Sequence, residues 1–456
     1  MTRADDRLAA AAERELPQAR QDLETLVRIP SVSADPAARS QVQASADEVA
    51  RLFRSTGVPD VQVVQADDGH PAVLARSPAP TGTATVLLYA HHDVQPPGDP
   101  QDWASDPFEP VERDGRLYGR GAADDKAGIA VHLAAVRALL AQDDGPGLGL
   151  TVLVEGEEEI GSPTLPELLR QHADRLAVDA LVLADSINWR VGVPALTTSL
   201  RGGTSVVVEV RTLQQAVHNG LYGGPVPDAL TVLARLLSTL HDDEGRVAVP
   251  GLRHGEADME VDEADFRREA GMLDGVRLLG RGSLASRLWS RPAISVVGID
   301  APPVAGSAMN LVPQARAKVA LRVAPGDDAA TARDALVEHL RRNAPWGAHV
   351  TVTAGKAVQP FAASTDGPAY AAARHAFEEA WGVPPVAIGV GGSIDFVTTF
   401  ARRFPQAEVL ITGVEDPDTR AHGPNESVHL ADFERAVVAE TLLLGRLAHY
   451  VSPQPR

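Results

Sequence analysis

Histidine and aspartate residues follow a run of apolar residues near position 90. Residues 84–90 predict a buried strand, and His91, His92 and Asp93 come directly after it. Imidazole suits zinc and similar divalent metals, and an aspartate two residues after a histidine could orient its ring. Because a polar turn after a strand would give the same pattern, this stretch alone fits both a metal site and a turn.

Two consecutive aspartates begin the next predicted helix. A glycine-rich segment that starts at residue 115 leads to Asp124 and Asp125, and residues 129–140 continue as a helix. Capping and the helix dipole both favour aspartate at a helix N-terminus. Capping explains one aspartate readily and two in succession less well, so a structural role and a chemical role both stay open.

Acidic residues follow the next predicted strand, residues 148–154. Glu155, Glu157, Glu158 and Glu159 lie within five positions and repel one another unless cations neutralise them. A solvated acidic loop is the alternative interpretation. It is weakened because the run directly follows a buried strand rather than lying in a polar linker.

Two more predicted strands end near residues that could bind a metal ion. Asp185 ends the strand 180–184, and His422 lies in the loop after the strand 407–412. A lone histidine in a loop usually lies on the surface. His422 is therefore a candidate metal ligand only because other potential ligands also lie at strand ends.

The residues at these strand and helix ends form one candidate set. Open α/β sheets usually place their chemistry at the carboxyl edge of the strands. Two imidazoles and three carboxylates would suit two divalent cations with one carboxylate between them, while one glutamate stays free to accept a proton from water. The set comprises His91, Asp124, Glu158, Glu159, Asp185 and His422.

The length and the order of predicted elements indicate two domains. A chain of 456 residues and 48.1 kDa is long for one hydrophobic core. Between about residues 196 and 354 the predicted order is β-α-β-β-α-β, which is typical of a ferredoxin-like sandwich. We therefore predict an α/β fold with a mostly parallel sheet flanked by helices, built from residues 1–195 and 358–456. An inserted ferredoxin-like α+β domain would occupy residues 196–357.

Composition excludes several classes of protein. The chain has no cysteine, so it has no disulfide framework, and any metal is held by His, Asp and Glu. Its net charge of −19 argues against binding to nucleic acids or to anionic membranes. No long apolar run predicts a membrane span, and the N-terminus lacks the apolar block of a signal peptide, so we expect a cytoplasmic protein.

Three segments carry a specific family resemblance: residues 90–96 (AHHDVQP), 117–126 (LYGRGAADDK) and 155–162 (EGEEEIGS). They resemble the di-metal peptidases that include carnosinase, cytosolic non-specific dipeptidase, aminoacylase-1 and succinyl-diaminopimelate desuccinylase, and they are most similar to the dipeptidase branch. The resemblance covers nearly the whole chain. It implies a catalytic domain like that of zinc peptidases and an inserted domain that acts as a lid and forms a homodimer.

The resemblance also implies a set of metal ligands. His91 and Asp185 would hold one divalent ion, Glu159 and His422 would hold the other, and Asp124 would bridge them. Zinc is the expected metal, with manganese or cobalt as alternatives. His92 matches a variable position of the family and is not assigned to a metal.

The resemblance implies further roles in catalysis and substrate binding. Glu158 would be the general base, Asp93 would orient His91, and His218 in the inserted domain would stabilise the oxyanion. For the loop at residues 389–393 a bare tight turn remains an alternative. The implied substrate-binding residues are Asn310, Arg322, Gly391, Gly392 and Ser393.

The predicted function is hydrolysis of the amide bond in dipeptides or short peptides that have a free C-terminal carboxylate. Deacylation of N-acyl amino acids is the alternative reaction, and a metal-binding or scaffold protein without catalysis is a different class. The expected partners are a small peptide substrate and a second copy of the chain. Strand 204–210 is a candidate edge for that dimer, unless it is covered within its own domain.

Overall fold

The described residues form two units, each with its own hydrophobic core. The computed structural model describes residues 3–142 and 145–449. Unit 1 contains residues up to 198, 363–388 and those from 395 onward, and unit 2 contains residues 199–362 and 389–394. Residues 389–394, which the sequence analysis places in the first domain, therefore belong to unit 2.

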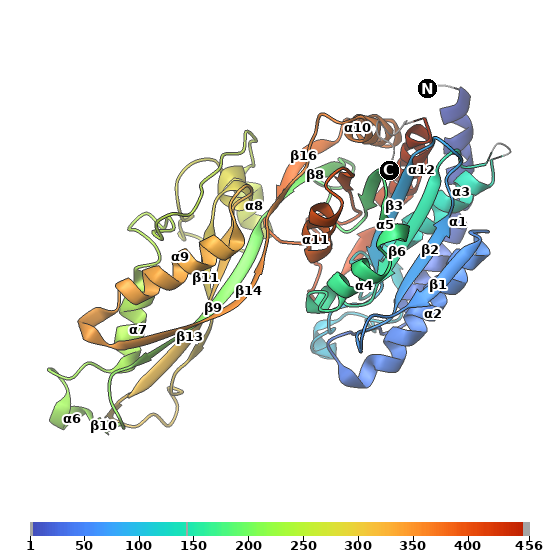
Figure 1. Cartoon of the computed structure of the whole chain (residues 1–456). Helices are drawn as coiled ribbons and strands as arrows, with labels where there is room; N and C mark the ends of the chain where they lie inside the picture. The colour runs from blue at the N-terminus through green and yellow to red at the C-terminus, as the bar shows by residue number, and fades with distance from the viewer. Residues whose placement is uncertain (1–2, 143–144, 450–456) are drawn as a thin grey trace. The chain divides into compact units, whose positions relative to one another are not determined.

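Unit 1 is built around a mixed sheet in which the central strands run parallel. The strand order is β1-β2-β6-β3-β7-β17-β8, with β16 paired to β8. The neighbouring strands β6, β3, β7 and β17 are parallel, and the strands outside them pair antiparallel. The predicted α/β fold with helices against a sheet that is parallel at its centre is confirmed (Figure 1).

The strands and the helix for which the sequence predicts ranges, namely 84–90, 129–140, 148–154, 180–184 and 407–412, agree with the observed elements within three residues. The sheet strands are β1 (Asp60–Val64), β2 (Ala72–Ser77), β3 (Thr85–His91), β6 (Gly149–Glu155), β7 (Ala180–Leu183), β8 (Ala195–Leu200), β16 (Val386–Val390) and β17 (Glu408–Ile411). A small antiparallel sheet contains β4 (Val111–Arg113), β5 (Arg116–Tyr118) and β18 (Ser427–His429). The helices are α1 (Arg3–Val27), α2 (Arg39–Ser55), α3 (Lys126–Leu140), α4 (Leu165–Gln171), α5 (Ala173–Leu176), α10 (Pro368–Trp381), α11 (Asp395–Arg403) and α12 (Leu430–Leu447).

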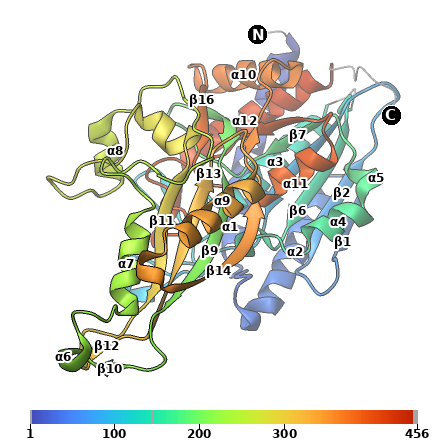
Figure 2. The ribbon, with the colours of Figure 1, turned by 60° about the vertical axis from the view of Figure 1, so that its left-hand side comes forward.

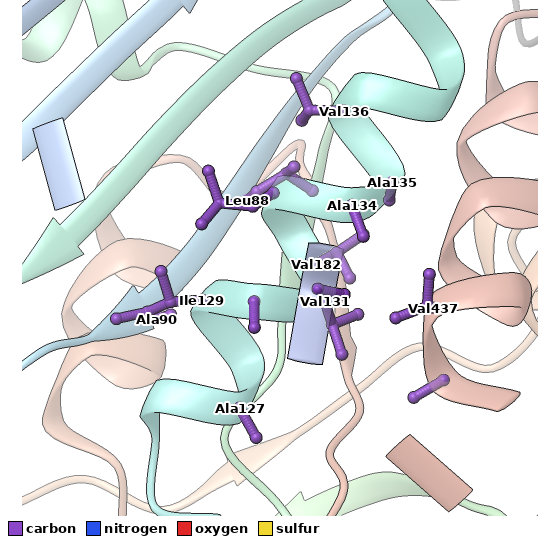
Figure 3. Close-up of a cluster of buried hydrophobic side chains, with 14 of the residues drawn as sticks. Leu88, Ala90, Ala127, Ile129, Val131, Ala134, Ala135, Val136, Val182 and Val437 are labelled. Carbon is purple, nitrogen blue, oxygen red and sulfur yellow. The ribbon is translucent and has the colours of Figure 1, made fainter. Parts of the chain in front are cut away.

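Strand β3 is fixed by packing on both of its faces. Its side chains alternate between the faces of the sheet. Leu88 and Ala90 join a core that also contains residues of α1, α3 and α12 (Figure 3). Tyr89 points the other way and stacks on Phe396 of α11, with 3.7 Å between ring centroids. Since each fully buried leucine contributes about 1.5–3 kcal/mol by leaving water, this packing holds the strand end at His91 firmly in place.

Unit 2 contains an antiparallel sheet with the strand order β11-β13-β9-β14. Alternate residues of β9 (Gly202–Arg211), such as Val206 and Val208, are buried in the second core. Helices α7 (Ala229–Ser238) and α9 (Ala329–Arg342) supply the other side of that core (Figure 2). The β-α-β-β-α-β order and this strand arrangement confirm the predicted ferredoxin-like fold.

Unit 2 contains the other strands of this sheet and several short elements that are not part of it. The other strands of this sheet are β11 (Ala293–Asp300), β13 (Gln314–Val323) and β14 (His349–Val358). The short elements are β10 (Val217–His218), β12 (Asn310–Leu311), β15 (Phe361–Ala362), α6 (Asn219–Tyr222) and α8 (Glu263–Glu269).

Strand β9 is not an edge of its sheet. It pairs with β13 on one side and with β14 on the other, so the suggestion that residues 204–210 form a free edge is wrong. Burial alternates along β9 because one of its faces covers a helical layer. At one end of the order lies β11, where Val296, Val297 and Ile299 are exposed.

Across the part of the chain that the structure covers, we find no helix that combines the length and the apolar character needed to traverse a bilayer.

Candidate active site

The predicted metal ligands lie together at the carboxyl ends of the parallel strands. His91 is the last residue of β3, and the other four lie in the segments after β6, β7 and β17 and before α3. Two groups of potential ligand atoms form, and the atoms within each group lie within 4.8 Å of one another. The first group is His91, Asp124 and Asp185, and the second is Asp124, Glu159 and His422.

Asp124 belongs to both groups and lies between the two imidazoles. Its Oδ1 is 3.0 Å from His91 Nε2, and its Oδ2 is 3.0 Å from His422 Nε2. His422 Nε2 also lies 3.2 Å from a Glu159 oxygen, while an Asp185 oxygen lies 4.0 Å from His91 Nε2. One carboxylate thus presents one oxygen to each side of the site.

The backbone and ring of His91 are held by two aspartates. Its backbone N–H donates to Asp125 Oδ2 at 3.2 Å. The ring Nδ1 lies 3.0 Å from the backbone oxygen of Asp93 and 3.5 Å from its carboxylate. Asp125 occupies the N-cap of α3 without a side-chain capping bond, so capping does not explain its carboxylate.

Asp93 also fixes the two neighbouring glutamates. Its carboxylate accepts the backbone N–H groups of Glu158 and Glu159, at 3.2 and 3.1 Å. Gln95 donates its backbone N–H and its side-chain amide to the Glu159 carboxylate, at 3.1 and 2.8 Å. The Glu159 carboxylate is therefore held by hydrogen bonds, whereas the contacts described for Glu158 include no hydrogen bond to its side chain.

The other two glutamates of the acidic run are structural rather than solvated. Buried Glu155 accepts hydrogen bonds from Tyr89 and Ser162, at 2.7 and 2.6 Å. Buried Glu157 accepts the backbone N–H of His70 and both the N–H and the hydroxyl of Thr164. These donors offset the repulsion between the carboxylates, and the alternative of a solvated acidic loop is wrong.

Crowding of charged groups shifts their proton affinities. Burial raises the pKa of Glu158 well above its ordinary value, and the charges of Asp185 and Glu159 add to this against the charge of His91. Burial raises the pKa of Asp185 to about 7. Hydrogen bonds to Asp124 and Glu159 raise the pKa of His422 to about 11.

The same crowding tests whether metal ions fit the site. Burial acts to lower the pKa of His91, but its bonds to Asp124 and Asp93 outweigh burial and raise it well above its ordinary value. Without cations, the negative charge of these carboxylates is offset only by protons bound to the carboxyl and imidazole groups of the cluster. Two divalent cations would neutralise the cluster, and its oxygen and imidazole donors with one shared carboxylate are a suitable ligand set.

In unit 2, the predicted oxyanion residue lies opposite one of the predicted substrate-binding residues. His218 of β10 pairs with Asn310 of β12 in a short antiparallel ladder. The ring Nδ1 of His218 accepts the backbone N–H of Gly220 at 3.0 Å, and the residue is exposed. The neutral ring therefore carries its proton on Nε2, which leaves an N–H donor available to a ligand.

Arg322 and Ser393 converge on a glycine of β9. Arg322 pairs with Gly203 across the sheet. A Cβ built on Gly203 would lie 3.4 Å from Arg322 Nη1 and 3.8 Å from Ser393 Oγ. Gly203 therefore lies directly beside the guanidinium and the hydroxyl.

The loop that carries Ser393 is docked on a second arginine. Arg201 donates from its backbone to Val390 O at 3.1 Å and from Nε to Gly391 O at 3.2 Å. A Cβ on Gly391 would approach Arg201 Nη2 to 2.6 Å. Gly391 is not among the glycines with a positive φ, so its small size matters here for packing against Arg201 rather than for a left-handed turn.

Sequence reasoning did not identify several residues that support the site. Gln95 lies only four residues after His91, inside the segment that carries the resemblance, but its partner Glu159 is 64 positions away. Arg120 and Glu426 contact each other across 306 positions. Arg120 lies inside the segment 117–126 that carries the resemblance, and Glu426 lies four residues after His422, but neither position indicates that the two residues contact each other.

Comparison with known proteins places this geometry in a family. The model of peptidase family M20/M25/M40 matches residues 87–445. A cysteinylglycine-S-conjugate dipeptidase from Corynebacterium striatum is 39% identical over 80% of this chain and 82% of its own length. The human Beta-Ala-His dipeptidase is 28% identical over 90% of this chain and 86% of its own length.

Solved structures show the same fold. The dipeptidase Dug1p from Saccharomyces cerevisiae superposes with a TM-score of 0.83 at 23% identity, covering all of both chains. Human carnosine dipeptidase 1 gives a TM-score of 0.82 at 24% identity and covers 98% of this chain and 99% of its own. From the extent of the family match and the 39% identical relative, we conclude that the chain belongs to peptidase family M20/M25/M40 and is a metal-dependent peptidase.

Proposed function

We propose that the protein is a metallo-dipeptidase that hydrolyses the amide bond of dipeptides with a free C-terminal carboxylate. The observation that carries this proposal is the pair of ligand groups that share Asp124. The relatives named as cysteinylglycine-S-conjugate and Beta-Ala-His dipeptidases support dipeptides as the substrate class. Deacylation of N-acyl amino acids is the competing reaction, and a substrate panel distinguishes the two.

The residues that would hold the metal ions are those of the two groups. His91 and Asp185 would bind one ion, Glu159 and His422 the other, and Asp124 both. The chemistry that such a pair supplies when bound is polarisation of a carbonyl and activation of water. Zinc suits this mixture of imidazole and carboxylate, and manganese and cobalt are the alternatives.

Glu158 is the group that we assign to proton transfer. Its backbone N–H is held by Asp93, as is that of Glu159, while Glu159 alone is also bound by Gln95. A carboxylate whose pKa is raised by burial can accept a proton from water and later deliver it to the leaving amine. Asp93 would orient both His91 and this pair of glutamates.

The side chains of unit 2 would bind the substrate. Arg322 would pair with the substrate carboxylate, assisted by Ser393 and by the backbone at Gly391 and Gly392. His218 would donate its Nε2–H to the oxyanion that forms at the scissile carbonyl, with Asn310 beside it.

The first test is metal content. Two divalent ions per chain are expected in protein purified without chelator, because two ligand groups share one carboxylate. Elemental analysis measures the ratio, and a chelator should abolish dipeptide hydrolysis until Zn²⁺, Mn²⁺ or Co²⁺ is restored. A ratio of one or zero that added metal does not raise would overturn the proposal.

The second test concerns the substrate carboxylate. Amidation of the C-terminus of a good dipeptide should lower kcat/KM by about 30-fold, which is equivalent to about 2 kcal/mol. This is the lower end of the range for loss of one partner of a charge pair, and we expect it because Arg322 is exposed. In Arg322→Gln the acid and the amide should be cleaved almost equally. Equal kcat/KM for acid and amide in the wild type would refute the assignment.

Two further features stay predictions. A homodimer through unit 2 is proposed from the family resemblance, and the end strand β11 with its exposed Val296, Val297 and Ile299 replaces β9 as the candidate edge. A cytoplasmic location is also proposed. Size-exclusion chromatography measures the oligomeric state, and cell fractionation measures the location.

A further inference from the structure

A buried carboxylate with no assigned role lies behind Asp124. Glu426 is fully buried, four residues after His422. Its carboxylate accepts four hydrogen bonds, one from Arg120 Nη1 at 2.5 Å and three from the backbone N–H groups of Gly121, Ala123 and Asp124 at 3.1, 3.0 and 3.2 Å. A carboxylate has about four acceptor positions, so Glu426 is saturated.

Arg120 extends this arrangement to the loop of His422. The guanidinium is 1% exposed and donates from Nη1 to Glu426 and from Nη2 to the backbone oxygen of Gly423 at 3.1 Å. Gly423 directly follows His422. The buried ion pair therefore joins the loop that carries Asp124 to the loop that carries His422.

A buried ion pair contributes little net stability, because desolvating two charges offsets most of their attraction. Its effect here is on position. The N–H of Asp124 is fixed by Glu426, and the carboxylate of the same residue lies 3.0 Å from each imidazole. Any shift of the 121–124 loop would change both of these contacts together.

We infer that Glu426, held by Arg120, is a positioning residue that sets the affinity of the site for divalent cations. The inference rests on the proposed function, because it takes Asp124 as the shared ligand. Glu426 itself faces backbone N–H groups and Arg120, so it acts through the placement of Asp124 and not as a ligand.

The test is the cation affinity of metal-free full-length protein, measured by competition with a chromophoric chelator for Zn²⁺. Glu426→Gln replaces one acceptor oxygen by an NH₂ group that faces N–H donors, and we expect affinity to fall about 10- to 100-fold, as for other residues that support metal ligands. Glu426→Asp keeps the charge and both oxygens and should recover part of the affinity. Arg120→Lys provides a second variant if Glu426→Gln does not unfold cooperatively, and it should also weaken Zn²⁺ binding.

Glu440→Gln is the matched control. Glu440 is a buried carboxylate of the same unit, 2.6 Å from His132 Nδ1, and none of the contacts that the structure describes for it reaches the 121–124 loop. This variant should lower the unfolding temperature of the metal-free protein and leave Zn²⁺ affinity within about threefold of wild type, below the range for supporting residues. If Glu426→Gln, or Arg120→Lys in its place, binds Zn²⁺ as tightly as wild type, the inference is wrong. If wild-type protein binds no Zn²⁺, the proposed function itself fails.

Discussion

Glu158→Gln should retain both metal ions and lose turnover, with kcat lowered by about 10²–10⁴, the range for removal of a general acid–base group. The substitution keeps the shape of the side chain and leaves the backbone N–H of residue 158 bonded to Asp93. The amide cannot accept a proton from water. Glu158 is also not in either ligand group, so its loss should not release metal.

Steady-state kinetics with a dipeptide and elemental analysis of the same sample measure the two effects. Glu167→Gln serves as a control, because Glu167 lies on the surface of α4 and pairs with Arg170. It should match wild type in both measurements. A Glu158→Gln enzyme with near-normal kcat would show that another group accepts the proton.

His218→Ala should lower kcat by about 10²–10³, the effect of deleting one oxyanion donor. The bond from Gly220 N–H to Nδ1 makes Nε2 the donating atom of the neutral ring. His218→Gln, which keeps an N–H donor, should recover part of the rate, while metal content stays unchanged in both variants. Equal kcat for His218→Ala and wild type would remove His218 from the mechanism.

The same variant tests whether the active site is shared between chains. His218 lies in unit 2, and all the proposed metal ligands lie in unit 1. If each site combines unit 1 of one chain with unit 2 of its partner, co-refolded His218→Ala and Glu158→Gln chains should regain about a quarter of wild-type activity, because half of random dimers are mixed and one of their two sites is complete. No recovery in a sample that contains mixed dimers would place His218 in the site of its own chain.

Local patterns in the sequence were sufficient for most elements of the fold. The unbroken apolar run before His91 predicted a strand covered on both faces, and β3 is buried throughout. The apolar pattern at 204–210 predicted a strand and a candidate dimer edge. It could not show that β9 has a neighbour on each side, because hydrogen bonds between strands depend on backbone partners rather than on side-chain type.

The residue types of the site were also visible, because metal ligands and the ends of buried strands restrict which side chains can occur. The contacts that hold these residues in place could not be predicted from the sequence. Capping was a reasonable explanation for Asp125, yet its carboxylate accepts the N–H of His91, 34 positions away. Glu155 and Glu157 resembled a solvated loop until Tyr89, Ser162, His70 and Thr164 supplied their donors.

The sequence by itself therefore determined the elements of the fold, the residue types at the strand ends and, through three motifs, the family of this protein. The family resemblance also implied that Asp124 is shared between the ions of His91 and His422, and only the tertiary structure revealed that Glu426 and Arg120 hold the backbone of Asp124 in place. The reason is physical: strand and helix patterns arise from neighbours a few residues apart, whereas these contacts join segments up to about 300 positions apart, which only the packing of the complete sheet brings together.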